Sequence, residues 1–142
     1  MSTQLVVFLL NKEYFAVEVA SVESIIKLQT ITKIPHAPLF VVGVTNLRGN
    51  IVPVIDLELR LSLPRTKPDI NTRIVVALIK DQKIGMVVDA VSQVVEIDEL
   101  QIEPTPKLST TIDSSFIKGI VKIEDDLIIL LDLEKIFEDV AK

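Results

Sequence analysis

The 142-residue chain has no cysteine, no tryptophan and a single histidine, and aromatic residues make up only 4% of it. The lack of cysteine excludes a disulfide framework and thiol chemistry, and it is typical of a cytosolic protein. Nucleic-acid binding favours a basic surface with aromatic stacking platforms, whereas this chain carries a net charge of −5. The composition therefore points away from nucleic acid as a partner.

Long apolar runs are also missing, although 49% of the residues are hydrophobic. No run reaches the roughly 18 residues that a membrane-spanning helix needs. The N-terminal stretch MSTQLVVFLLNKEYF has neither a basic region nor a small-residue cleavage site, so it does not predict a signal peptide. We expect a soluble, cytoplasmic protein without direct membrane insertion, whose surplus apolar surface contacts partner proteins.

The residues for metal or acid–base chemistry are sparse. His36 lies between two prolines in an expected loop, and the four glycines form neither a phosphate-binding nor a dinucleotide-binding motif. Acidic residues cluster only at Glu124, Asp125 and Asp126, where a hairpin turn explains them. We expect no catalytic residue, metal, cofactor or small-molecule substrate. Two alternatives from other classes are a hydrolase that uses Asp125, Asp126 and Asp132, and a β-module that associates with itself.

The apolar residues are mostly β-branched and occur in short runs bounded by Gly, Pro, Asp or Asn, which predicts strands. Alternation within these runs is imperfect, as expected of strands that are buried on both faces or that belong to a tightly curved sheet. Helical patterning is confined to Asp56–Leu63 and Asp132–Ala141. Each segment begins with an aspartate suited to N-capping, and Pro64 ends the first.

An internal repeat organises the chain. Residues 43–61 align without gaps on residues 119–137, and residues 5–26 align on residues 74–95, with shifts of 76 and 69 positions. Because the first of these shifts is larger, the second copy has a longer middle loop, which we place in residues 103–115.

Each copy holds about 70 residues and roughly five strands, which suits a small barrel that leaves no open sheet edges. Barrels of this size are marginal alone, so we expect a shared apolar layer between them. The prediction is an all-β single domain (1–142) of two pseudo-repeated, five-stranded SH3-like barrels packed together. The approximate subdomains are 1–66 and 67–142, with room for strand exchange, and short helices follow the signature hairpin and lie at the C-terminus.

The most organised segment is the predicted hairpin around Leu47-Arg48-Gly49-Asn50. Gly49 and Asn50 tolerate the positive φ of a tight hairpin turn, and Pro53 favours an edge or bulge position because it cannot donate a ladder hydrogen bond. The second copy builds the same turn with acids. Turn chemistry therefore leaves Arg48 open as either a solvated charge or a recognition residue.

Several blocks resemble the CheW family of bacterial chemotaxis coupling proteins. GVTNLRGNIVPVIDLELRL (43–61) is similar to the family signature G-x-x-N-L-R-G followed by x-P-(V/I)-x-D-L and a short helix. The similarity extends to three further blocks in the same order along the chain. They are EYFAVEVASVESI, IGMVVDAVSQVVEI and FIKGIVKIEDDLIILLDLEKIF.

The resemblance implies two intertwined five-stranded barrels and a non-catalytic adaptor for bacterial chemotaxis signal transduction. The implied partners are the cytoplasmic hairpin of a chemoreceptor (methyl-accepting chemotaxis protein) and the CheW-like regulatory domain of the histidine kinase CheA. Such an adaptor would be cytoplasmic and would join membrane receptor arrays through its partners. The length and the start at Met1 argue against a CheA fragment or a CheV-like half, while a paralogue serving another array stays open.

The resemblance also implies the receptor-binding residues. They are Val22, Ile25, Asn46, Leu47, Arg48, Gly49, Val87, Val88 and Val94, and Asp89 and Val91 belong to the same second-barrel block. The structural turn or cap residues are Asn50, Pro53, Asp56 and Asp132. One departure is that the family's V-x-E-I element has Ser24 in place of its glutamate, with Glu23 one position earlier. The group that orients Arg48 is thus left open.

Overall fold

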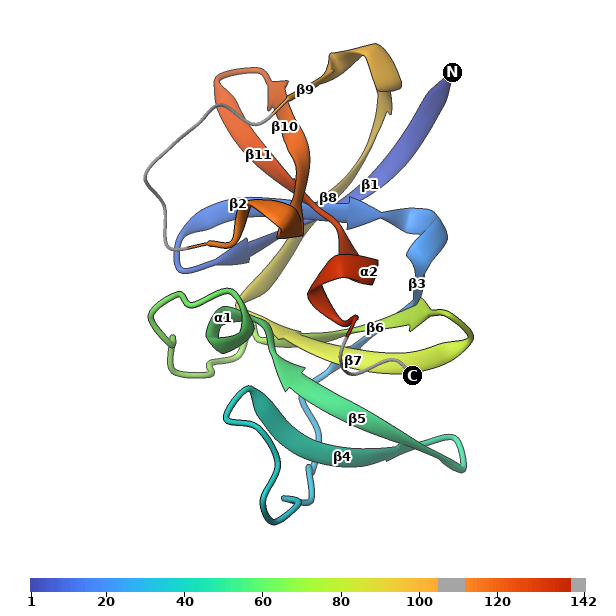
Figure 1. Ribbon diagram of the computed structural model, residues 1–142, viewed down its shortest axis with the longest axis vertical. Coiled ribbons are helices and arrows are strands. Elements are labelled where there is room, and N and C mark those ends of the chain that lie inside the picture. Colours follow the sequence, from blue (N-terminus) through green and yellow to red (C-terminus); the bar gives the residue numbers. More distant parts are fainter. Residues whose placement is uncertain (105–111, 139–142) are drawn as a thin grey trace.

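The structure, a computed structural model, describes residues 1–104 and 112–138. Two sheets and a few single-turn helices make up these residues, which confirms the prediction of an all-β protein (Figure 1). The loop that we placed in residues 103–115 lies mostly outside the described residues.

Each sheet curves into a small barrel. In spatial order, the first consists of β8 (Ala90–Asp98), β1 (Ser2–Leu10), β2 (Glu13–Glu18), β11 (Asp126–Leu131), β10 (Ile117–Ile123) and β9 (Ile102–Glu103). The second consists of β3 (Val22–Lys27), β6 (Arg73–Ile79), β7 (Gln82–Val88), β5 (Asn50–Asp56) and β4 (Val41–Leu47). A bridge between Thr32 and Val44 adds the segment after β3 to β4. We call the two units barrel A and barrel B.

The barrels do not follow the two halves of the chain. β1 and β2 pair with strands from the C-terminal half, and β6 and β7 pair with strands from the N-terminal half. Pairings between strands of different copies hold this exchange together. β1 with β8 and β3 with β6 are antiparallel, and β2 with β11 and β5 with β7 are parallel. The remaining pairings among the described strands are antiparallel. Each barrel therefore contains strands from both repeat copies.

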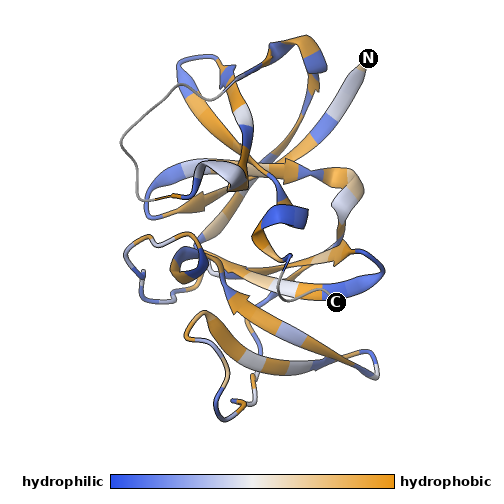
Figure 2. Cartoon of the chain, viewed as in Figure 1, coloured by the Kyte–Doolittle hydropathy of each residue, from blue (hydrophilic) through white to orange (hydrophobic). Residues whose placement is uncertain are grey.

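Strands at the barrel junction are buried on both faces, which explains their imperfect alternation. In β1, Leu5 and Val7 point into barrel A, while Val6 and Phe8 point into a layer between the barrels. In β6, Ile74 points into barrel B and Val75 into the same shared layer. The shared layer is the largest of the three apolar clusters, and Figure 2 shows the hydrophobic residues concentrated along the strands that form it.

The repeat is visible in matching contacts. The Asp56 N–H donates to the Phe40 carbonyl at 2.7 Å, and the Asp132 N–H donates to the Phe116 carbonyl at 2.8 Å. Each residue of the second pair lies 76 positions after its counterpart in the first pair, which is the repeat shift. Equivalent backbone hydrogen bonds thus fix the entry to β4 and to β10 beside the ends of β5 and β11.

The two helices are single turns: α1 spans Leu57–Arg60 and α2 spans Leu133–Ile136. Asp56 Oδ1 accepts from the Leu59 N–H and Asp132 Oδ1 accepts from the Lys135 N–H, each at 3.2 Å, so both aspartates act as N-caps. The helical segments predicted from the sequence are longer than these turns. The first ends early because Ser62 adopts a left-handed φ of 61° ahead of Pro64.

Three 3-10 turns complete the fold: η1 (Val19–Ser21), η2 (Glu99–Gln101) and η3 (Ser114–Phe116). The first lies where the chain leaves barrel A for barrel B, between β2 and β3. The return to barrel A takes place between β7 and β8, where only Asp89 separates the two strands. Asp89 therefore lies at the junction of the barrels.

Candidate partner-binding site

The β4–β5 hairpin carries the predicted signature residues at its tip. Arg48 and Gly49 form the two-residue turn, with φ values of 52° and 85°, the left-handed pair that suits the twist of an antiparallel hairpin. Positive φ was expected at Gly49 and Asn50. Asn50 is instead the first residue of β5 and pairs with Leu47, so the two-residue loop lies one position earlier in the chain than expected.

Asn46 stabilises this turn, since its Oδ1 accepts a hydrogen bond from the Gly49 N–H at 3.0 Å. Arg48 is exposed, and within residues 1–104 and 112–138 it makes no hydrogen bond or ion pair. Turn geometry therefore accounts for its backbone but leaves its guanidinium free. Glu23 does not orient it, because Glu23 pairs with Lys83 at 3.0 Å.

Pro53 lies in β5, which is an inner strand and not an edge. The pairing of β5 with β7 begins one residue later, at Val54 and Gly85. Asn50 to Pro53 therefore have β4 on one side only, and their other side borders a pocket shared with the β6–β7 turn. The missing donor of Pro53 is tolerated because β7 pairs with β5 only beyond it.

Val22, Ile25 and Val94 lie on edge strands, β3 in barrel B and β8 in barrel A. Ile25 is paired with Val75 and Val94 with Val6, and both partners belong to the shared layer. Since cross-strand partners share a face, Ile25 and Val94 continue this layer towards solvent. Their side chains are 39% and 57% exposed. Val22 packs against the same layer, as does Val91 of β8.

Val87 and Val88 point to opposite sides of β7. Val88 is fully buried in the shared layer, so a direct receptor contact by its side chain, as the resemblance implied, does not fit this structure. Val87 is half-buried inside barrel B, in the same apolar cluster as Leu47. The predicted residues thus occupy a hairpin tip, two sheet edges and the interior, and do not form a single patch.

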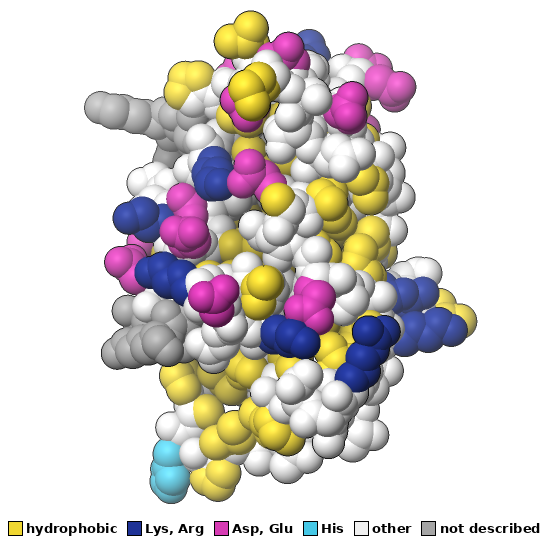
Figure 3. Space-filling view, turned by 90° about the vertical axis from the view of Figure 1, so that its right-hand side faces the viewer, with side chains coloured by type: hydrophobic (Ala, Val, Ile, Leu, Met, Phe, Trp, Pro, Cys, Tyr) yellow, Lys and Arg dark blue, Asp and Glu magenta, His cyan; other side chains and the backbone are white. Residues whose placement is uncertain are grey.

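On the face shown in Figure 3, basic and acidic side chains form a band across the middle of the molecule, and hydrophobic side chains are exposed above and below this band. This is the side on which the β6–β7 hairpin and the β4–β5 hairpin project in Figure 1. A partner surface here would meet both apolar and charged side chains.

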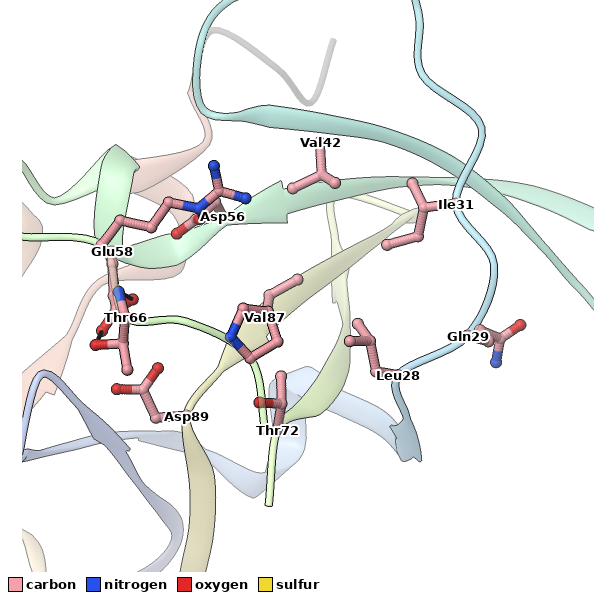
Figure 4. Close-up of a pocket in the computed structure, with 12 residues that line it drawn as sticks. Leu28, Gln29, Ile31, Val42, Asp56, Glu58, Thr66, Thr72, Val87 and Asp89 are labelled. Carbon is pink, nitrogen blue, oxygen red and sulfur yellow. Dashed lines mark hydrogen bonds and ion pairs between the residues drawn. The ribbon is translucent and has the colours of Figure 1, made fainter. Parts of the chain in front are cut away.

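A pocket of about 160 Å³ opens at the end of barrel B nearest the barrel junction. In Figure 4, Asp56, Glu58, Thr66 and Asp89 lie on one side of the pocket, and aliphatic side chains such as Val42 and Ile31 lie on the other. Arg65 Nε forms an ion pair with Asp56 Oδ2 at 3.1 Å at its rim. We call this the junction pocket.

Glu58 is the most constrained acid of the junction pocket, with a side chain only 3% exposed. It accepts from the Thr66 N–H and hydroxyl at 2.8 Å each, and the Asn11 N–H donates to both Glu58 Oε2 and Asp89 Oδ2 at 2.9 Å. Burial raises the pKa of Glu58; the Thr66 hydrogen bonds oppose this shift, and neighbouring Asp89 adds to it. Sequence reasoning missed this pair, since Glu58 reads as an ordinary first-turn helix residue.

The remaining residues considered for metal or acid–base chemistry lie in exposed loops or turns. His36 lies in an exposed loop with a φ of 61°, and Glu124 to Asp126 are exposed around the β10–β11 turn. Across the described ranges, no group of three or more metal-binding side chains comes together. Within the same ranges, no helix is long and apolar enough to cross a membrane.

Two intertwined barrels that share an apolar layer define a CheW-like domain. The family model described as "CheW-like domain" matches residues 4–141, so the chain belongs to the CheW-like family. The similarity to this family stated from sequence motifs is confirmed.

Solved and curated relatives agree with this assignment. The crystal structure of the scaffolding protein TtCheW from Thermoanaerobacter tengcongensis is 42% identical, with a TM-score of 0.90 over 100% of this chain and 92% of that one. The chemotaxis protein CheW of Rhizobium meliloti is 34% identical over 134 residues, 94% of this chain and 86% of the relative. The chemotaxis protein CheW of Thermotoga maritima is 36% identical over 134 residues, 94% and 87% of the two chains.

Proposed function

We propose that this chain is a chemotaxis adaptor that couples the cytoplasmic tips of chemoreceptors to the histidine kinase CheA. The observation that carries the proposal is the match of residues 4–141 to the CheW-like family together with relatives named as chemotaxis and scaffolding proteins. The adaptor has no catalytic role of its own and reaches the membrane through its partners.

The receptor-binding surface is proposed to consist of the exposed hairpin tip and the two edge strands beside the shared layer. Ile25 and Val94 supply apolar contacts where that layer reaches solvent. Arg48 supplies a guanidinium that no other described residue engages, so it can form charge-assisted hydrogen bonds with a receptor helix. Six further residues shape the surface through packing and turn geometry: Val22, Asn46, Leu47, Gly49, Val87 and Val88.

The kinase contact is proposed to pair one barrel end with a barrel end of the CheW-like domain of CheA, because domains of the same fold present similar surfaces. Two such ends on each adaptor allow alternating contacts that close into rings. Modest affinity at each contact then suffices, because an array multiplies the contacts.

The decisive experiment is co-sedimentation of the protein with receptor cytoplasmic fragments and CheA. The wild type is expected to enter the ternary pellet. Arg48→Glu is expected to weaken receptor binding about tenfold or more, since it replaces a charge-assisted donor with a repelling acid. Circular dichroism should be unchanged because Arg48 is exposed at a turn.

Lys122→Glu is the matched control, because it reverses an exposed basic residue on β10 of the other barrel. Equal binding by Arg48→Glu and wild type would remove Arg48 from the site. Absence of the wild type from the pellet would contradict the adaptor function.

The absence of catalysis has its own test. Asp125→Asn combined with Asp126→Asn is expected to keep full co-sedimentation, because these residues lie around an exposed turn. A hydrolase activity in the wild type that this double variant loses would establish the alternative enzyme function.

A further inference from the structure

A pocket beside the β3–β4 connection of barrel B combines aliphatic and basic side chains. Its volume is about 240 Å³, and its lining includes Lys33, Ile34 and Leu39 from this connection, together with Arg65 from the segment after α1. We call this the loop pocket. Since an apolar cavity of ~150 Å³ holds a benzene molecule, the loop pocket has room for an aliphatic side chain.

The two aliphatic residues of the connection are exposed on a backbone that is held in place. Ile34 is 45% exposed and Leu39 is 94% exposed. Figure 3 shows exposed hydrophobic side chains next to the histidine at the lower end of this face, and His36 lies between the two residues in the sequence. The Val41 N–H donates to the Pro38 carbonyl at 2.9 Å, which closes the end of the connection. A fixed loop that presents aliphatic side chains beside a pocket favours contact with a partner's apolar group, because little order is lost on binding.

The charges of this region are basic, although the chain is acidic overall. The net charge is −5, yet residues 24–55 contain no aspartate or glutamate. Residues 100–131, which lie 76 positions later in the second copy, contain five. Asp56 also lines the loop pocket, but it is only 6% exposed and is already paired with Arg65. A partner with complementary charge is therefore acidic.

Lys33 and Arg65 both have donors available for a carboxylate. Within residues 1–104 and 112–138, Lys33 forms no ion pair. Arg65 is held through its Nε, 3.1 Å from Asp56 Oδ2, and over the same ranges no ion pair engages its two terminal nitrogens. Its side chain is 59% exposed. Asp56 thus fixes the guanidinium, while the terminal nitrogens remain free to bind a second carboxylate from solvent.

We propose that the loop pocket docks an acidic segment of another protein, in which leucine side chains are flanked by carboxylates. One leucine enters the pocket and packs on Ile34, Leu39 and Val42. A neighbouring carboxylate binds the guanidinium of Arg65, and another pairs with the ammonium of Lys33. The apolar contact supplies most of the affinity, and the two cations fix the orientation of the segment.

The loop pocket is separate from the hairpin tip that is proposed to bind receptors. The β3–β4 connection precedes β4 and the turn at Arg48 follows it, so the two lie at opposite ends of this strand of 7 residues. A strand of this length spans roughly 20 Å. Docking at the loop pocket is therefore additional to the adaptor function and does not depend on it.

The direct test is a titration of the full chain with the peptide acetyl-EELLE-amide, followed by NMR chemical shifts of backbone amides. We expect saturable shifts at Ile34, Leu39 and Val42, and none around Lys118 in barrel A. Two control peptides separate the contributions, since acetyl-QQLLQ-amide lacks the charges and acetyl-EEAAE-amide lacks the leucines. Each control should bind at least about tenfold more weakly, because it loses either the charge-assisted hydrogen bonds or the apolar contact.

Substitutions at exposed positions, which should leave the fold intact, assign the site. Lys33→Glu and Leu39→Ser should each weaken binding of acetyl-EELLE-amide about tenfold. Their matched controls in barrel A are Lys122→Glu and Leu100→Ser, which should bind as the wild type does; Leu100 is 90% exposed, close to the value for Leu39. The absence of saturable shifts in the wild type, equal binding of either control peptide, or wild-type affinity in Lys33→Glu or Leu39→Ser would overturn the proposal. None of these outcomes bears on co-sedimentation with receptors.

Discussion

Glu58 of α1 and Asp89 at the β7–β8 junction accept hydrogen bonds from one backbone donor, the Asn11 N–H, at 2.9 Å each. Asn11 belongs to the β1–β2 turn of barrel A, while Glu58 follows β5 of barrel B. Thr66, in the segment between α1 and β6, donates twice to Glu58. A buried carboxyl group therefore connects both barrels to this linking segment.

This relationship predicts a pH-dependent stability. Because the pKa of Glu58 is raised by burial and by Asp89 above its ordinary 4.5, the folded protein binds more protons than the unfolded chain between the two pKa values. The stabilisation from this group is fully present below pH 4.5 and is lost as pH rises through the folded pKa. Urea unfolding at pH values from 4 to 8 measures it.

Glu58→Gln isolates the effect from other titrating groups. The stability of the wild type relative to Glu58→Gln should fall as pH rises through this window, since glutamine does not ionise. Glu134→Gln, the exposed counterpart in the second copy, should run parallel to the wild type. A difference in the free energy of unfolding between wild type and Glu58→Gln that stays constant with pH would contradict the prediction.

Arg60 is expected to hold α1 and α2 together. Its guanidinium lies 4.8 Å from the Phe40 ring centre and 5.0 Å from that of Phe116, and its Nε donates to the Ile136 carbonyl at 2.8 Å. Arg60→Ala should lower the free energy of unfolding by about 2–4 kcal/mol, through lost cation–π contacts and a charged hydrogen bond.

Arg60→Lys should recover only part of this loss, because an ammonium cannot stack between two rings as a planar guanidinium does. Arg48→Ala, which removes an exposed arginine, should change stability by less than about 0.5 kcal/mol. Chemical denaturation compares the three variants. Equal effects of the alanine substitutions at Arg60 and Arg48 would show that the ring contacts do not stabilise the protein.

Gly43 is expected to tolerate no side chain. A Cβ atom there would lie 2.1 Å from the Thr32 carbonyl oxygen, which accepts from the Val44 N–H at 2.8 Å in the bridge that follows β3. Gly43→Ala should therefore destabilise the protein by about 3 kcal/mol or more, because backbone must move. Loss of protection of the Val44 amide in hydrogen exchange would locate the damage.

Gly49 provides the contrast at the hairpin tip. A Cβ atom there meets nothing within 4 Å, so only its φ of 85° opposes a side chain. Gly49→Ala should cost about 1–2 kcal/mol in thermal or urea unfolding. A larger cost at Gly49 than at Gly43 would contradict the close-contact argument.

The two cap aspartates should differ although they occupy equivalent positions. Asp132→Ala should cost about 1 kcal/mol, the usual value for an N-cap. Asp56 is 6% exposed and also pairs with Arg65, so Asp56→Ala should cost more, by about 1–3 kcal/mol, because it leaves buried donors unpaired. Urea unfolding of both variants measures the loss in the free energy of unfolding. Equal losses would show that the burial of Asp56 does not add to the effect of losing its N-cap.

Local patterns were sufficient for the all-β class, the repeat, the hairpin and the cap positions. Asp56 and Asp132 cap their helices because an aspartate before Leu-Glu is a local signal that needs no tertiary context. The turn residues were displaced by one, since hairpin loop length depends on cross-strand register. The burial of Val88 also escaped prediction, because adjacent valines give no sign of which face meets the second barrel.

By itself, the sequence determined the strand-forming runs, the two copies and the membership of the CheW-like family, since these depend on residue type, spacing and motif. Only the tertiary structure decided that each barrel contains a hairpin from the other copy and that no other described residue pairs with Arg48. It also brought Glu58 to Asp89, 31 positions away in the chain. Such contacts depend on how two curved sheets pack in space, and local sequence does not encode which residues far apart in the chain meet there.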